Sequence, residues 1–221
     1  MSASDLDLVE GTAAGVARTV SDLIFDGSLR AGRPVRESAT AAQLGVSRNT
    51  VREALRILER SGLVRFERNR GALVSAPTVE RTRDLYRARL SVEVGAVHAA
   101  DMEGAGPVIQ QAFDRIHDTQ HRGLPRETLE ADLAFHAAVV GLAESSRLDL
   151  LFQDIATELR LYLSLLSSSV DEYSDDDRVL TEHAGITRAF RAADRDAAIA
   201  LLADHVKTNA DRIVAIVRNR S

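Results

Sequence analysis

The chain has no cysteine and no tryptophan, and only four of its 221 residues are proline. The absence of cysteine excludes disulfide bonds and thiolate metal sites, so a metal site must use histidine and carboxylate ligands. No apolar run approaches the ~18 residues that a membrane-spanning helix needs. The polar, acidic N-terminal segment lacks the apolar core of a signal peptide. We therefore expect a soluble, cytoplasmic protein.

Charge is distributed unevenly along the chain, although the net charge is only −5. Residues 28–77 contain ten arginines and four acidic residues, a net of +6. Residues 78–221 contain 17 basic and 24 acidic residues, a net of −7. A basic segment joined to an acidic one favours nucleic-acid binding by the basic segment.

The stretch from Gly45 to Leu55 has the pattern of a turn followed by a DNA-recognition helix. Gly45 tolerates a turn conformation that a Cβ atom would penalise, and Ser47 is a good helix N-cap. One apolar stripe at helical spacing is expected to pack on earlier helices, and polar side chains of the first turns lie off it. Such side chains reach base edges and phosphates in a major groove; the alternative is a solvated arginine face on an ordinary helix. The stripe consists of Val51, Ala54, Leu55 and Leu58, and the off-stripe residues are Arg48, Asn49 and Arg52.

The sequence after this helix predicts a β-hairpin. Gly62 is expected to end the helix. The β-prone runs 63–66 and 72–75 are joined by a polar tip that carries two arginines and ends in glycine. Upstream, residues 37–44 predict one short helix, and an earlier amphipathic helix is indicated by Val16, Val20, Leu23 and Ile24. Helix, turn, helix and basic hairpin together predict a winged helix-turn-helix.

Beyond a short linker at residues 77–78, strand signals disappear and apolar residues recur at helical spacing. This pattern predicts a mainly α chain, with a winged domain over 1–77 and an all-α bundle of six helices over 78–221. Gly104, Gly106 and Pro107 are expected to break the first bundle helix, and the polar segment 167–177 is expected to be a loop. The fourth helix carries an apolar stripe of Leu148, Leu151, Ile155, Leu159 and Leu163.

Four residues of the predicted bundle carry side chains that bind divalent metals. Asp132 and His136 are four residues apart, so both project from one helix face. His183 falls near the start of the fifth helix, and His205 lies within the sixth. Imidazole with carboxylate suits Zn, Ni, Fe or Mn. The residues alone leave the alternative open: a surface carboxylate, and histidines that are exposed or bonded to a carbonyl in the core.

The N-terminal motifs resemble the GntR family of bacterial transcription regulators. They are Ile24-x-x-Gly27-x-Leu29-x-x-Gly32, the run from Leu44 to Leu55, Leu58-x-x-x-Gly62-Leu63-Val64, and Asn69-x-Gly71-x-x-Val74. The resemblance implies operator contacts from the recognition helix and the wing tip. Some members carry arginine where Ser38 stands, and Arg36 is the candidate in its place. The implied DNA-contact residues are Arg36, Ser47, Arg48, Asn49, Thr50, Arg52, Arg68, Arg70 and Gly71.

The bundle resembles the FCD effector-binding domain of the FadR-like branch of that family. The matching motifs are Arg89-x-x-x-Glu93 followed by Ala99-Ala100, Asp132-x-x-x-His136, Glu182-His183, and the run from Ala198 to His205. The resemblance implies a divalent metal, Zn, Ni or Mn, and a small organic acid whose carboxylate completes its coordination. The implied metal ligands are Asp132, His136, His183 and His205.

Two further residues are candidates for effector binding. Arg89 is either an anchor for the effector carboxylate or the partner of Glu93 in an ion pair within one helix. Asn209, one turn beyond His205, is either an effector contact or a capping or surface residue. By contrast, His98, His117 and His121 are expected to be exposed.

The sequence therefore predicts a ligand-responsive transcriptional regulator that binds operator DNA as a homodimer and is not an enzyme. A small organic acid bound at the metal site is expected to control operator binding. Two alternatives stay open at this point. One is a metal-dependent enzyme fused to a DNA-binding module, and the other is a regulator that senses the metal itself.

Overall fold

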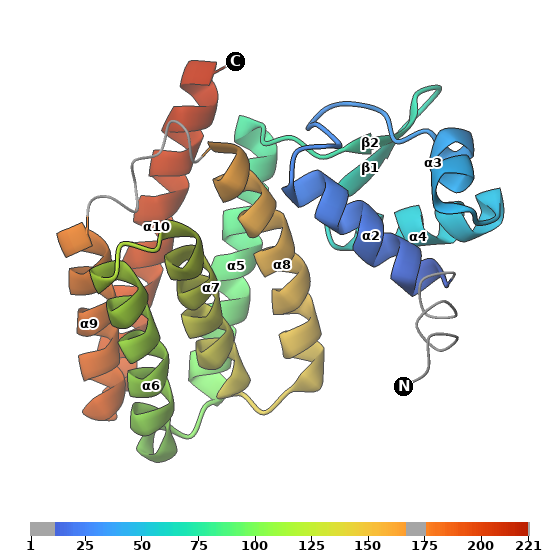
Figure 1. Ribbon diagram of the computed structural model, residues 1–221. Coiled ribbons are helices and arrows are strands. Elements are labelled where there is room, and N and C mark those ends of the chain that lie inside the picture. The colour runs from blue at the N-terminus through green and yellow to red at the C-terminus, as the bar shows by residue number, and fades with distance from the viewer. Residues whose placement is uncertain (1–11, 167–175, 221) are drawn as a thin grey trace. The chain divides into compact units, whose positions relative to one another are not determined.

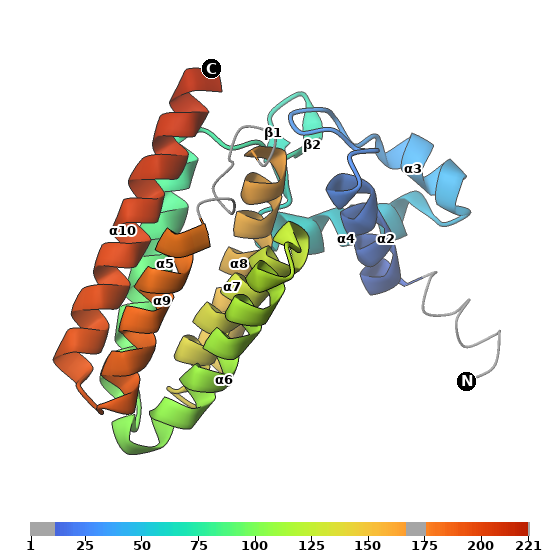
Figure 2. The same ribbon diagram turned by 60° about the vertical axis from the view of Figure 1, so that its left-hand side comes forward.

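The computed structural model describes residues 12–166 and 176–220 (Figures 1 and 2). Within these residues the chain forms nine helices and one two-stranded sheet. It divides into two compact units. The first reaches Ala76 and takes in the segment Thr157–Leu165, and the second begins at Pro77. No helix among the described residues is long and apolar enough to cross a lipid bilayer.

The first unit is a winged helix-turn-helix, as predicted. Helix α4 packs against α2, α3 and strand β1. The two strands pair in an antiparallel hairpin in which Val64 faces Val74 and Glu67 faces Gly71. The elements are α2 (Ala13–Phe25), α3 (Glu37–Leu44), α4 (Arg48–Arg60), β1 (Val64–Glu67) and β2 (Gly71–Val74).

The turn before α4 is built as the sequence predicts. Gly45 has a φ of 67°, in the left-handed region that glycine adopts without steric penalty. The Ser47 hydroxyl accepts a hydrogen bond of 3.0 Å from the backbone N–H of Thr50, which satisfies a donor at the start of the helix. The predicted stripe is buried, and the polar residues of the first turn face outward.

The second unit is a helical bundle (Figure 1), to which five described helices belong whole and α8 belongs outside Thr157–Leu165. In it α5 packs against α7 and α10, while α6 packs against α7 and α9. The helices are α5 (Val79–Ala99), α6 (Met102–His121), α7 (Pro125–Gly141), α8 (Ser146–Leu166), α9 (Asp176–Arg191) and α10 (Arg195–Arg220). Of the predicted loop, residues 167–175 lie outside the described residues, and the last two belong to α9.

The predicted break at Gly104, Gly106 and Pro107 is wrong, because all three lie inside α6. The break comes earlier, where Asp101 caps the helix by accepting a hydrogen bond of 3.1 Å from the Glu103 N–H. Glycine serves a packing role here. A Cβ atom on Gly106 would lie 3.2 Å from the backbone Cα of Arg191 in α9, so the absent side chain lets the two helices approach.

We predict opposite effects of alanine at two glycines of α6. Gly104→Ala should raise the free energy of unfolding by about 0.5–1 kcal/mol, because alanine favours helix more than glycine and a Cβ there meets only Asp101 Oδ2 at 3.9 Å. Gly106→Ala should lower it, because the new Cβ crowds the backbone of α9. Urea denaturation of both variants tests this pair, and equal stabilisation by both would contradict the packing role.

Candidate metal centre and nucleic-acid interface

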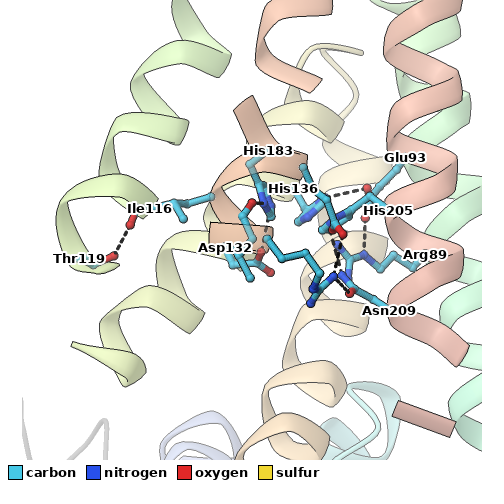
Figure 3. Close-up of polar contacts among 12 residues, drawn as sticks. Arg89, Glu93, Ile116, Thr119, Asp132, His136, His183, His205 and Asn209 are labelled. Carbon is cyan, nitrogen blue, oxygen red and sulfur yellow. Dashed lines mark hydrogen bonds and ion pairs between the residues drawn. The ribbon is translucent and has the colours of Figure 1, made fainter. Parts of the chain in front are cut away.

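The four predicted ligands meet inside the second unit. Asp132 and His136 come from α7, His183 from α9 and His205 from α10, and all are buried. One potential ligand atom from each lies within 4.8 Å of the others. Figure 3 shows the four side chains pointing toward one another. This is the one such cluster of histidine and carboxylate groups among the described residues.

In each imidazole of the cluster, the Nδ1 atom forms a hydrogen bond with an acceptor outside the cluster. The Nδ1 of His136 lies 2.9 Å from Glu93 Oε2, and that of His205 lies 2.7 Å from Glu182 Oε2. The Nδ1 of His183 lies 2.8 Å from the carbonyl oxygen of Val179. Carbonyl and carboxylate oxygens only accept, so each Nδ1 carries the proton. A neutral ring then presents the lone pair of Nε2, which is the form that ligates a metal.

The three Nε2 atoms have environments that suit a cation. The Nε2 of His183 lies 3.0 Å from Asp132 Oδ1, and two acceptors at that separation need a proton or a metal ion between them. The Nε2 of His136 is buried and has no hydrogen-bond partner among the described residues. The Nε2 of His205 lies 3.2 Å from the Asn209 amide nitrogen, which a metal ion would displace. The donor set therefore fits a divalent ion held by nitrogen and oxygen.

Burial sets the protonation of the cluster. Desolvation lowers the pKa of His205 to about 4, and desolvation together with the charge of Arg89 also lowers the pKa of His136. Burial alone would raise the pKa of Asp132, but its contacts with His183 and nearby positive charge lower it on balance. At neutral pH the site thus offers neutral imidazoles from His136 and His205 and an ionised carboxylate from Asp132.

A buried ion pair on α5 borders the cluster. Arg89 Nε lies 2.6 Å from Glu93 Oε1, and both side chains are buried. Burial opposes charge on Glu93, yet Arg89 and His136 lower its pKa to about 2. The predicted ion pair within the helix is therefore present. However, Arg89 Nη2 is buried with no hydrogen-bond partner in the described chain, which leaves one donor for a ligand.

Sequence reasoning missed the orienting roles of Glu93 and Glu182. Glu182 bonds both His205 and Arg178, whose Nη1 lies 2.8 Å from Glu182 Oε1 and 3.5 Å from Asn209 Oδ1. The sequence did point to both glutamates, because each belongs to a motif that resembles the FCD domain. Glu93 lies four residues after Arg89, and Glu182 directly precedes His183. The histidines expected to be exposed, 98, 117 and 121, are exposed.

Some of the predicted DNA-contact residues gather in the first unit. Arg36, Arg48, Arg70 and Gly71 line one shared hollow, together with parts of the segment before α3, of α3 itself and of β2. They come from the start of α3, the start of α4 and the wing. Their placement brings positive charge from three elements to a single surface, as phosphate binding requires.

The other predicted contacts are also placed on this unit. Arg52 is exposed but makes two hydrogen bonds to Glu37, of 3.2 and 2.9 Å. Ser47 and Thr50 contact each other through their hydroxyls at 2.8 Å, so both take part in capping. Asn49 and Arg68 are exposed. On the wing, Arg70 also donates a hydrogen bond of 2.7 Å from its Nη1 atom to Glu67.

Comparison with known proteins matches both halves of the chain. The family model described as "Bacterial regulatory proteins, gntR family" matches residues 12–74, and that of the FCD domain matches residues 84–208. A crystal structure of GntR from Rhodococcus sp. RHA1 is 32% identical, with a TM-score of 0.76, over 92% of this chain and 97% of that one.

Two curated relatives are similar over most of their length. The probable D-xylose utilization operon transcriptional repressor of Paenarthrobacter nicotinovorans is 29% identical over 88% of this chain and 87% of its own. The gluconate operon transcriptional repressor of Bacillus subtilis is 26% identical over 83% of this chain and 77% of its own. Because these proteins are transcriptional regulators, the chain falls among regulators and not among enzymes.

We predict that His205 makes the stability of the metal-free protein depend on pH. The folded pKa of about 4 lies below the ordinary value of 6.5, so the unfolded chain binds this proton first. The contribution is therefore present above pH 6.5 and is lost as the pH falls toward 4. With chelator present, the difference in melting temperature between wild type and His205→Gln should shrink across that window. A difference that stays constant would show that the ring is not buried in its neutral form.

Proposed function

The chain belongs to the GntR family of bacterial regulatory proteins and carries an FCD domain, and we propose that it is an operator-binding regulator controlled by a small organic acid. We assign residues 1–77 to the DNA-binding domain and 78–221 to the domain that binds metal and effector. The observation that carries this proposal is the buried set of three imidazoles and the Asp132 carboxylate, whose potential ligand atoms lie within 4.8 Å of one another.

Operator binding is assigned to the basic surface of the winged unit. The polar residues at the start of α4 are assigned to base and phosphate contacts, because the first turns of a recognition helix make such contacts in a major groove. Arg48 is exposed in the first turn of α4 and lines the same hollow as Arg70. One such module reads few base pairs, so we propose a homodimer that binds two half-sites.

We predict that Arg48→Ala lowers operator affinity and leaves the fold intact. The side chain lies off the packing stripe of α4, so its loss should cost about 1–3 kcal/mol of binding per half-site and little stability. Arg126→Ala is a matched control, because it removes an exposed arginine from the first turn of α7. Fluorescence anisotropy on operator DNA, with a melting curve for each variant, measures both effects. Equal affinity of Arg48→Ala and wild type would remove this residue from the contact set.

The metal site is assigned to Asp132, His136, His183 and His205, with Zn, Ni or Mn as the ion. When bound, the ion would supply positive charge and coordination positions for a carboxylate. The neutral imidazoles add no charge, and Arg89 and Glu93 balance each other. One ionised aspartate therefore offsets only half of a divalent charge. This imbalance favours an anionic effector.

The effector is proposed to be a small carboxylic acid held by the metal and by Arg89. The buried Nη2 of Arg89 has no partner in the described residues, and an unmade hydrogen bond of this kind is costly until a ligand supplies an acceptor. Asn209 shares the face of His205 and is the neutral donor that the acid would meet. A relative named as the repressor of the gluconate operon supports control of an operon by this chain.

We predict that carboxylate binding requires the metal. Protein loaded with Zn, Ni or Mn should hold about one ion per chain and should melt at a higher temperature than chelated protein, because the ion binds the folded state alone. A panel of small carboxylates that includes gluconate should raise the melting temperature further only when metal is present. Arg89→Lys should keep the ion and lose the response to acid, since lysine lacks the planar fork of donors.

The control for this experiment is His117→Ala, which removes an exposed histidine of α6 and should change neither metal content nor melting. His205→Ala should lose both the ion and the acid response. Wild-type protein that holds no ion and is not stabilised by any of the three metals would contradict the assignment. Operator affinity that follows free metal with no acid present would make the metal itself the signal.

A further inference from the structure

Helix α8 has apolar residues on two faces, although one face is enough to pack it into the bundle. Phe152 and Ile155 are buried, and Phe152 packs with Ala96 and Val140 of neighbouring helices. Leu150 and Leu151 are 63% and 53% exposed, the highest values among the large apolar side chains that are exposed in the described residues. Two adjacent exposed leucines on a helix form a patch that water solvates poorly.

The charged residues that flank this patch make it self-complementary. Arg147 and Asp154 are exposed and lie with the two leucines at positions i, i+3, i+4 and i+7, so all four share one helix face. The positive charge of Arg147 lies at one end of this face, and the negative charge of Asp154 lies at the other. The apolar pair lies midway between them.

A two-fold axis through the midpoint of this face would bring unlike groups together. In an antiparallel pair of identical helices, contacting positions add to a constant number. Here 147 plus 154 and 150 plus 151 both give 301, so Arg147 would face Asp154 of a second copy and Leu150 would face its Leu151. An interface of this kind is isologous, because the same patch serves both subunits, and near-antiparallel helices can pack at 8–10 Å.

We propose that the outer face of α8 between Arg147 and Asp154 is a contact surface for a second copy of this chain. The inference rests on the homodimer proposed above and names the surface that forms it. The occupant is a second copy because the charges complement themselves under two-fold symmetry. A partner of a different sequence would have no reason to match that order.

A charge-swap experiment tests the surface in the full-length protein. Arg147→Glu and Asp154→Arg should each raise the dissociation constant of the dimer by about tenfold or more, because each places like charges opposite one another twice. The double variant, with both charges exchanged, should recover dimerisation. Mixing the two single variants should give heterodimers, because every contact between them then joins unlike charges. Sedimentation velocity at low ionic strength measures all four cases.

The leucines have a matched control elsewhere in the bundle. Leu150→Glu should weaken the dimer, whereas Val108→Glu should leave it unchanged, although Val108 on α6 is also exposed, at 47%. Circular dichroism melts confirm that each variant is folded. Equal weakening by Val108→Glu, or single charge variants that dimerise as wild type does, would overturn this surface while leaving the homodimer in place. A monomeric wild type would overturn the homodimer as well, whereas the assignment of operator contacts is judged separately by Arg48→Ala.

Discussion

The Nδ1 hydrogen bonds of three histidines are the interaction on which the candidate site depends. Each ring donates to an acceptor on α5 or α9, and this donation selects one tautomer and one ring orientation. Without those acceptors, a buried neutral imidazole would be free to turn its lone pair away from the centre. Three Nε2 atoms and one carboxylate therefore converge because groups outside the cluster hold them, and four helices of the bundle must stay packed for the geometry to survive.

The same bonds connect the cluster with the charged groups around it. Glu93 accepts from both His136 and Arg89, so a single buried carboxylate orients a ligand and neutralises a guanidinium. Removing one partner of a buried pair leaves the other charge uncompensated, which is more costly than the pair itself. Glu182 plays the corresponding part at the half-buried edge, where it bonds His205 and Arg178. The deep side of the site is thus tightly constrained, while the edge formed by α9 and α10 is closer to water.

The sequence was most informative where a single residue determines local geometry. Ser47, Gly45 and the four-residue spacing of Asp132 and His136 were all predicted, because caps, left-handed turns and helix faces follow from a few neighbouring residues. The break at Gly104 to Pro107 was wrong because local propensity favoured it, whereas the approach of α9 to Gly106 requires that same glycine inside a helix. The exposure of Leu151 could not be predicted from the sequence pattern either. Its spacing matches the stripe of Leu148 and Ile155, and a helix with two apolar faces gives one periodic signal.

The arrangement of the candidate metal ligands before metal binding limits which parts of the site an effector can change. An effector shifts a protein only by as much as it binds one state better than another. The ligand-orienting bonds of His136 and His183 are already in place in the described structure, so a metal ion entering the cluster finds these groups prearranged. The ion would enter between His183 and Asp132, and it would displace the amide of Asn209, a residue outside the ligand set, from His205; Asn209 also contacts Arg178. Rearrangement is therefore concentrated at the edge between α9 and α10. A carboxylate that completes the metal's coordination would meet the released amide there, so this edge is where differential binding energy can arise.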